Sequence, residues 1–221
     1  MKKYLYLFIF VFANSLLSAQ WISVFDDEFN EDTLDLNKWY NIQPWGQYDP
    51  RVLPIVFLRE NVSLKNGYLL LTLKEDHKTP YSEDTSLKYS YSAGMIWSKK
   101  YFKYGIFEAR IKIPNVRGVW SAFWLYGSGQ YGDEIDIFEQ CPHKIIYNNK
   151  KDNKISISPN LVNLAVTIHN LGEAVWDNNI YDTSFLHDWH TYKLIWDDKY
   201  IKIYIDDEKI SAFKKSRKGY I

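Results

Sequence analysis

The chain has 221 residues, and its 27 basic and 27 acidic side chains give a formal net charge of zero at pH 7. No overall field therefore attracts nucleic acid or an anionic membrane, and we expect neither as a partner. Aromatic residues make up 18% of the chain, including 9 Trp and 18 Tyr. This excess over the needs of a core predicts exposed stacking platforms.

The first nineteen residues have the pattern of a secretory signal peptide. Lys2 and Lys3 precede an apolar run from Tyr4 to Ala13, and small residues end at Ala19. The run is shorter than the roughly 20 apolar residues of a membrane-spanning helix. We therefore expect cleavage after residue 19, a secreted or periplasmic location and no membrane attachment afterwards.

Residues 20 to 221 have the length of one all-β domain. Helical periodicity is scarce, and short runs of β-branched and aromatic residues recur between turn signals, a pattern typical of a β-sandwich or jelly roll. The predicted strands are Val62 to Leu64, Tyr68 to Lys74, Ser92 to Trp97, Gly105 to Ile113, Val119 to Tyr126, Glu134 to Gln140, Leu164 to Asn170, Thr191 to Asp197 and Tyr200 to Asp206.

Turn chemistry separates several of these strands. Asn66-Gly67 is a hairpin signal, and Asp197-Asp198 and Asp206-Asp207 are polar breaks flanked by alternating Ile, Tyr and Trp, so consecutive strands are expected to be mostly antiparallel. Long loops are predicted from Tyr40 to Phe57 and from Lys144 to Pro159. After Asp206 the sequence predicts a basic tail without a closing strand. Cys141 is the only cysteine, so no disulfide forms within the chain.

The strand that begins at Glu134 carries unusual charges. Because side chains alternate along a strand, Glu134 and Asp136 share one face while Ile135 and Ile137 point into the core. Strict alternation would bury Glu139 with the two isoleucines. A β-bulge would return Glu139 to the face of the other acids, and such bulges are common beside active sites.

Three carboxyl groups on one strand face repel one another, which indicates a chemical purpose. Retaining glycosidases use two carboxyl groups roughly 5 to 5.5 Å apart, one as nucleophile and one as proton donor. We assign Glu134 as the nucleophile, Glu139 as the general acid and then base, and Asp136 as the residue that hydrogen-bonds Glu134 and tunes its charge.

Two other interpretations of these acids stay open. Clusters of this kind are often only a solvated face. Asp133, Glu134, Asp136 and Glu139 are also oxygen ligands of the type that calcium prefers, although calcium loops use flexible backbone rather than a buried strand. We therefore expect no metal and no cofactor at this strand.

The sequence around the acids resembles glycoside hydrolase family 16, the group of laminarinases, lichenases, agarases and carrageenases. The resemblance covers about Trp21 to Asp207. It is carried by an ordered series of segments: Phe25-Asp26-Asp27-Glu28-Phe29, Leu36-Asn37-Lys38-Trp39, Asn66-Gly67-Tyr68-Leu69, Ser92-Ala93-Gly94-Met95-Ile96, Tyr104-Gly105-Ile106-Phe107-Glu108-Ala109-Arg110, Trp120-Ser121-Ala122-Phe123-Trp124-Leu125, Glu134 to Glu139, and His190-Thr191-Tyr192 with Trp196 and Tyr204-Ile205-Asp206.

This resemblance implies a jelly roll of two curved antiparallel sheets with the acids in a concave sugar-binding cleft. It gives Glu134, Asp136 and Glu139 the roles assigned above. The motif spacing is that of the bulged branch, to which laminarinases, agarases and carrageenases belong. The segment from Asn41 to Glu60 does not match the pattern of laminarinases. The resemblance also implies further strands after Asp206, so the chain is expected to be incomplete at its C-terminus.

Three more residues are candidates for substrate binding. Trp120 and Trp124 lie four residues apart on one predicted strand, and similar family members stack sugar rings there; core packing is the alternative. Phe123 and Leu125, on the opposite face, already supply core. The resemblance also implies that His169 contacts the sugar, and a purely structural role is equally compatible with its strand position.

These observations predict a monomeric, secreted endo-β-glycanase that hydrolyses an extracellular polysaccharide of the β-1,3-glucan or marine galactan class with retention. Two alternatives stay open. A carbohydrate-binding remnant would keep the aromatic cleft without turnover. A transglycosylase would use the same two carboxyl groups with a sugar as acceptor.

Overall fold

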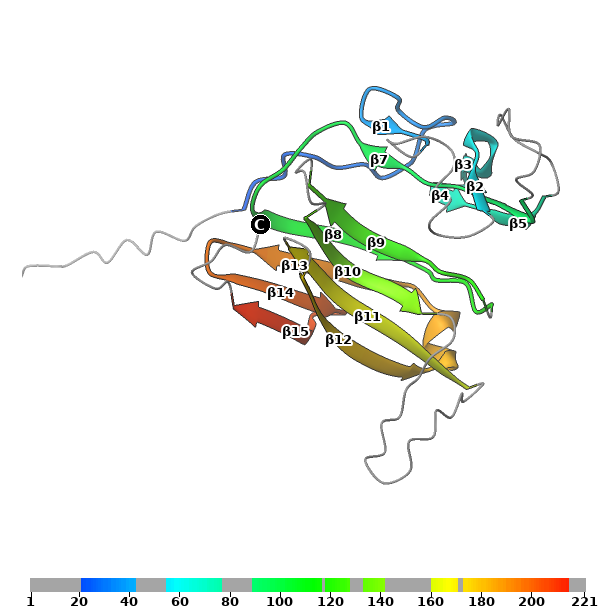
Figure 1. The fold of residues 1–221 in the computed structure, drawn as a ribbon. Helices are drawn as coiled ribbons and strands as arrows, with labels where there is room; N and C mark the ends of the chain where they lie inside the picture. The colour runs from blue at the N-terminus through cyan, green and yellow to red at the C-terminus, as the bar shows by residue number, and fades with distance from the viewer. Residues whose placement is uncertain are drawn as a thin grey trace, which may run out of the picture. The chain divides into compact units, whose positions relative to one another are not determined.

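The computed structural model describes residues 21–42, 55–76, 89–116, 118–127, 133–141, 160–170 and 173–214. Within these ranges the protein consists of β-strands and two short 3-10 helices (Figure 1). The all-β fold class is therefore confirmed. The predicted signal peptide and the loop from 144 to 159 lie outside the described ranges. A search of the described residues for an apolar helix of membrane-spanning length finds none.

The chain divides into two compact units, residues 1–101 and 102–221. The first unit contains three small sheets and a 3-10 helix, η1. Its elements are β1 (Trp39–Tyr40) paired with β7 (Trp97–Ser98), β3 (Val62–Lys65) paired with β4 (Tyr68–Leu71), the sheet of β2 (Ile55–Phe57), β6 (Tyr91–Ala93) and β5 (Leu73–Glu75), and η1 (Arg59–Asn61).

Two predicted strands of this unit are each divided in the structure. The segment from Tyr68 to Lys74 separates at Thr72 into β4 and β5, which lie in different sheets. The cause is the backbone of Thr72, whose N–H donates to the carbonyl of Asn61 while its own carbonyl accepts from the N–H of Gly94. The predicted strand from Ser92 to Trp97 divides in the same way into β6 and β7.

Gly94 lies against backbone with no room for a side chain. A Cβ atom built there would overlap the carbonyl group of Asn61 and would lie 3.2 Å from the Cα of Leu71. Asn61 is itself fixed, since it is 1% exposed and its Nδ2 donates to Ser92 Oγ at 2.8 Å. Glycine at this position therefore permits β6 to approach the segment after η1.

The second unit is a sandwich of two four-stranded antiparallel sheets. One sheet has the order β12-β11-β10-β9 and the other has the order β15-β14-β13-β8 (Figure 1). The elements are β8 (Gly105–Ile111), β9 (Ala122–Tyr126), β10 (Glu134–Cys141), β11 (Leu161–Asn170), β12 (Glu173–Asp182), the 3-10 helix η2 (Thr183–His187), β13 (His190–Trp196), β14 (Tyr200–Ile205) and β15 (Glu208–Lys214).

The two sheets share one hydrophobic core. Every second residue of the central strands points inward, which is the alternation that the sequence predicts. From one sheet the buried side chains are Ile135, Ile137, Phe138, Val162, Leu164, Val166 and Ile168, and from the other they are Tyr192, Leu194, Trp196, Ile201, Ile203 and Ile205. Phe123 and Leu125 of β9 pack against this core, as predicted. This packing fixes which face of β10 remains outside.

Two strands of the second unit contradict the sequence-based expectation. Residues 208–214 were expected to be a tail, but they form β15, which pairs with β14. The tight turn that joins the two strands has positive φ angles at Asp206 and Asp207, 49° and 66°. These angles are the type I′ geometry that favours a two-residue hairpin. β12 was not predicted, because its polar run from Asp177 to Asn179 has the composition of a loop.

We expect Gly94→Ala to lower the free energy of unfolding by about 1 to 3 kcal/mol, the usual cost of forcing extra volume into a packed site. Urea denaturation followed by tryptophan fluorescence measures it. Gly127→Ala is the control, because its nearest contact is milder, 3.1 Å from the carbonyl oxygen of Asp133. Equal stability of the Gly94 variant and the wild type would show that β6 can shift away from the Asn61 carbonyl without cost.

Candidate active site

A β-bulge in β10 brings the three acids to one face. The pairing of β10 with β11 shifts register between Asp136 and Glu139, and the pairing with β9 shifts between Asp136 and Phe138. Ile137 and Phe138 are consecutive in sequence, yet both are buried, at 0% and 1% exposure. The ring of Phe138 packs against Tyr192 with centroids 4.4 Å apart. The predicted bulge is thus confirmed, and it turns Glu139 away from the core.

The strand register defines the neighbours of each acid. Glu134 lies between Tyr126 of β9 and His169 of β11, and Asp136 lies in the next row along. Directly paired residues of antiparallel strands project from the same face of a sheet. The acids, the histidine and the side chains of β9 that pair with them therefore share the face opposite the core.

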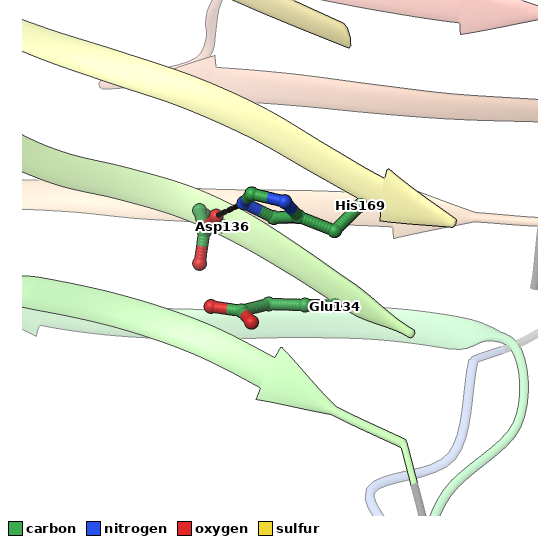
Figure 2. A group of neighbouring side chains, drawn as sticks. All are labelled: Glu134, Asp136 and His169. Atoms are coloured by element: carbon green, nitrogen blue, oxygen red, sulfur yellow. Dashed lines mark ion pairs between the residues drawn. The ribbon is translucent and has the colours of Figure 1, made fainter. Parts of the chain in front are cut away.

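Glu134, Asp136 and His169 form a compact group (Figure 2). Asp136 is almost fully buried, with 1% of its surface exposed. Its Oδ2 atom lies 3.5 Å from Nε2 of His169, whose side chain is 43% exposed. Asp136 also makes side-chain hydrogen bonds to Glu134 and Glu139. It is therefore the centre of the cluster, with the other groups arranged around it.

Burial and like charges keep Asp136 protonated. Desolvation raises the pKa of Asp136 to about 10, with further contributions from the negative charges of Glu139 and Glu134. Burial also raises the pKa of Glu134, while the hydrogen bond with Asp136 and the charge of His169 oppose that rise. At neutral pH the proton of the cluster therefore resides on Asp136. The protonated carboxyl group donates a hydrogen bond to a neighbouring carboxylate.

Glu139 is held by two donors, one from the segment before β9 and one from β11. The indole Nε1 of Trp120 donates to Oε1 at 3.1 Å, and the hydroxyl of Thr167 donates to Oε2 at 3.1 Å. Trp120 precedes β9, which begins at Ala122, so its predicted place within the strand is wrong. The ring is nevertheless 50% exposed beside the acids. Trp120 can therefore offer a ring face to a ligand while its N–H orients Glu139.

Trp124 projects from the middle of β9 beside Asp136, with which it is paired. Its ring contacts Tyr126 edge-on, with centroids 5.6 Å apart. The side chain is only partly buried, and it lies on the face opposite Phe123 and Leu125. Trp124 therefore lies on the face where a stacking residue was predicted. Its contact with a sugar remains a prediction.

The cluster also has the donors of a metal site. Glu134, Asp136 and His169 offer three ligand atoms that all lie within 4.8 Å of one another. The calcium alternative relied on oxygen ligands alone, whereas this group includes an imidazole, a donor that suits zinc or another transition ion better than calcium. Such an ion would have to displace the proton of Asp136.

Thr167 is a site residue that was not anticipated from the sequence. It is paired with Asp136 across β10 and β11 and is 7% exposed. A usable signal was present, because Thr167 lies two residues before His169 and hence on the same strand face. Threonine is common in β-strands, so its presence at this position does not by itself indicate a functional role.

The sequence model described as "Beta-porphyranase A-D, GH16 domain" matches residues 20–219. The chain belongs to this family of glycoside hydrolases. The glucan endo-1,3-beta-glucosidase A1 of Niallia circulans is 28% identical over 209 residues, which cover 83% of this chain and 28% of that protein. A beta-glucanase of Acetivibrio thermocellus is 26% identical over 201 residues, covering 90% of this chain and 50% of that protein. The GH16 chain thus spans half or less of these two curated relatives.

Solved structures support the same fold. The laminarinase catalytic domain of Thermotoga maritima MSB8 matches the GH16 chain with a TM-score of 0.67 and 21% sequence identity. The match covers 88% of this chain and 77% of that one. At this identity the likeness establishes the fold alone. The predicted jelly roll and the resemblance to glycoside hydrolase family 16 are both confirmed.

We expect Asp136→Asn to gain stability relative to the wild type as pH rises from 5 to 9. Because the pKa of Asp136 is about 10 when folded and 3.8 in the reference state, the folded protein holds a proton that the unfolded chain releases. Stability of the wild type therefore falls with rising pH, by at most about 1.4 kcal/mol per pH unit from this group. Asparagine removes that dependence.

Thermal unfolding of both proteins across the pH range measures the difference. Asp197→Asn is the control, since the backbone N–H groups of Lys199 and Tyr200 lower the pKa of that exposed carboxyl. Its variant should show no growing advantage above pH 5. A constant difference between the Asp136 variant and the wild type would mean that Asp136 is ionised in the folded protein.

Proposed function

We propose that the protein is a secreted, endo-acting glycoside hydrolase that cleaves a β-linked polysaccharide with retention of configuration. The observation that carries the proposal is the bulged strand, which holds Glu134, Asp136 and Glu139 on one face with a shared proton. Membership of a glycoside hydrolase family supports the reaction class. Secretion rests on the pattern of residues 1–19.

Glu134 is the proposed nucleophile. Asp136 donates a hydrogen bond to it and His169 contributes positive electrostatic character, and both effects favour the carboxylate form. The carboxylate attacks the anomeric carbon as the bond to the leaving sugar breaks, and water later hydrolyses the glycosyl-enzyme ester. During the attack Glu134 loses its negative charge, so the hydrogen bond from Asp136 guides the starting geometry rather than the ester.

Glu139 is the proposed general acid and then base. Asp136 is hydrogen-bonded to both glutamates, and its single proton serves one of them at a time. A carboxyl group that contacts both glutamates keeps them near one another, and a short separation suits retention, whereas inverting enzymes need room for a water molecule.

The proton that the leaving oxygen needs is already in the cluster. Asp136 holds it and is hydrogen-bonded to Glu139, so a short transfer supplies the acid. Thr167 suits either state of Glu139, because a hydroxyl group can donate to a carboxylate or accept from a carboxylic acid. It is a positioning residue in this mechanism.

The proposed substrate is a porphyran-type galactan. The family description that matches residues 20–219 names porphyranases. The segment from Asn41 to Glu60 also lacks the pattern associated with laminarinases. A β-1,3-glucan is the second candidate, because the curated relative from Niallia circulans is described as a glucan endo-1,3-beta-glucosidase. Trp120 and Trp124 would provide stacking surfaces for either sugar.

Glu134→Gln should abolish reducing-end release from the true substrate while leaving polysaccharide binding intact, because the amide keeps the shape but cannot form the glycosyl ester. The assay uses purified residues 20–221 on porphyran, agarose, carrageenan, laminarin and lichenan, with binding followed by affinity electrophoresis. Activity of the variant within about tenfold of the wild type would remove the nucleophile assignment. Binding without release by a folded wild type would favour the carbohydrate-binding remnant.

Thr167→Val should lower kcat by about 10- to 100-fold with little change in KM, since a hydrogen bond to a charged group contributes about 1.5 to 3 kcal/mol and each 1.4 kcal/mol is about tenfold in rate. Thr167→Ser should restore most of the loss. Adding Thr167→Val to Glu139→Gln should cost little more, because the hydroxyl acts through Glu139. Full additivity of the two substitutions would assign Thr167 a separate, structural role.

A further inference from the structure

Trp176 is a large exposed side chain on the strand at the edge of the acidic sheet. It belongs to β12 and is 62% exposed. Thr167 of β11 is paired with Asp136 on one side and with Trp176 on the other. Trp124 of β9 pairs with Asp136 from the opposite side. One row therefore crosses the whole sheet, with a tryptophan at each end and the buried acid between them.

The face that Trp176 occupies follows from the burial of β11. Ile168 and Val166 point into the core, so Thr167 points to the acidic face. A directly paired residue shares that face. The exposed ring of Trp176 consequently projects on the side of Glu134 and Glu139. Its neighbour Val175 pairs with Ile168 and projects on the other side.

A polar group stands beside the ring on the same face. Asn178 pairs with Ala165, which in turn pairs with Glu139. The Nδ2 atom of Asn163 donates to Oδ1 of Asn178 at 2.7 Å. Because Oδ1 of the exposed Asn178 accepts this bond, its Nδ2 group is the end of the amide that can donate to a ligand. An aromatic face with an adjacent amide donor is the chemistry that recognises a sugar ring and its hydroxyl groups.

We propose that Trp176 and Asn178 form an additional sugar subsite at the β12 edge of the acidic sheet. This inference rests on the proposed function and extends it. The polysaccharide would cross the strands, with one part against Trp124 and another stacked on Trp176, and the scissile bond over the acids. The site selects for chain length, because only a ligand long enough to reach across Thr167 from the acids contacts Trp176 while its scissile bond lies over them.

The distance from the acids determines the test. Trp176 lies two strands away from Asp136, about 10 Å at the usual strand spacing. A short substrate that fills only the positions around the acids does not contact the ring. Loss of Trp176 should therefore weaken the use of long chains and spare short ones.

The experiment compares Trp176→Ala with the wild type on the hydrolysed polysaccharide and on a short aryl glycoside of the same sugar. KM for the polysaccharide should rise about tenfold, and kcat/KM for the short substrate should stay within about twofold. Trp176→Phe should recover most of the loss, because it keeps an aromatic face. Val175→Ala is the matched control on the same strand, and it should behave like the wild type.

Other outcomes overturn the inference. Equal losses on long and short substrates, or a similar loss in the Val175 variant, would mean that β12 has a structural role only. A wild type that dimerises in size-exclusion chromatography, with a monomeric Trp176 variant of unchanged activity, would assign the ring to self-association.

Binding of the polysaccharide in the Glu134→Gln background separates failure of the subsite from failure of the function. Binding that does not depend on Trp176 overturns the subsite alone. An inactive wild type whose polysaccharide binding still requires Trp176 supports the subsite without the hydrolase. Absence of any binding or release overturns both.

Discussion

The bulge in β10 is the constraint on which the rest of the site depends. By burying both Ile137 and Phe138, the strand places one residue more in the core than strict alternation allows. The contact of Phe138 with Tyr192 of the opposite sheet anchors that extra residue. Glu139 then emerges on the same face as Glu134. The spacing of the two proposed catalytic carboxyl groups is thus set by hydrophobic packing on the far side of the sheet.

Crowding of acids on that face has an electrostatic cost, and the structure limits it with a proton. Three ionised carboxylates within hydrogen-bond reach would repel one another strongly in a site of low dielectric constant. Because Asp136 is the most deeply buried of the three, it is the group that remains neutral. Neutralisation converts a repulsive contact into a hydrogen bond that orients Glu134. A proton that stabilises the fold is in this way also available for transfer.

Most of the sandwich could be predicted from the sequence, because its central strands obey the alternation of a half-buried sheet. The acids and the bulge could be predicted for the complementary reason, since Glu139 violates that alternation. β12 and β15 could not. Edge strands bury little, so the polar run from Asp177 to Asn179 carries no hydrophobic signal, and pairing with β11 alone decides its structure. The division of one predicted strand at Thr72 likewise depends on distant backbone partners.

The residues proposed to contact the substrate depend on strand register more than the proposed catalytic acids do. Glu134, Asp136 and Glu139 lie within six consecutive positions of one strand, and the bulge that brings Glu139 to the face of the other two is signalled by its break in the alternation. Thr167 and His169 reach the acids through the register of β10 and β11, which sequence spacing does not reveal, and Trp120 reaches Glu139 from the segment before β9. The sequence does not show which face Trp176 occupies, because that face is set by the pairing of β12 with β11. Once the register is known, each position along β10 defines a row of paired residues across the sheet. The side chains of that row, rather than the sequence motif of the acids, determine which part of a long glycan the row can contact.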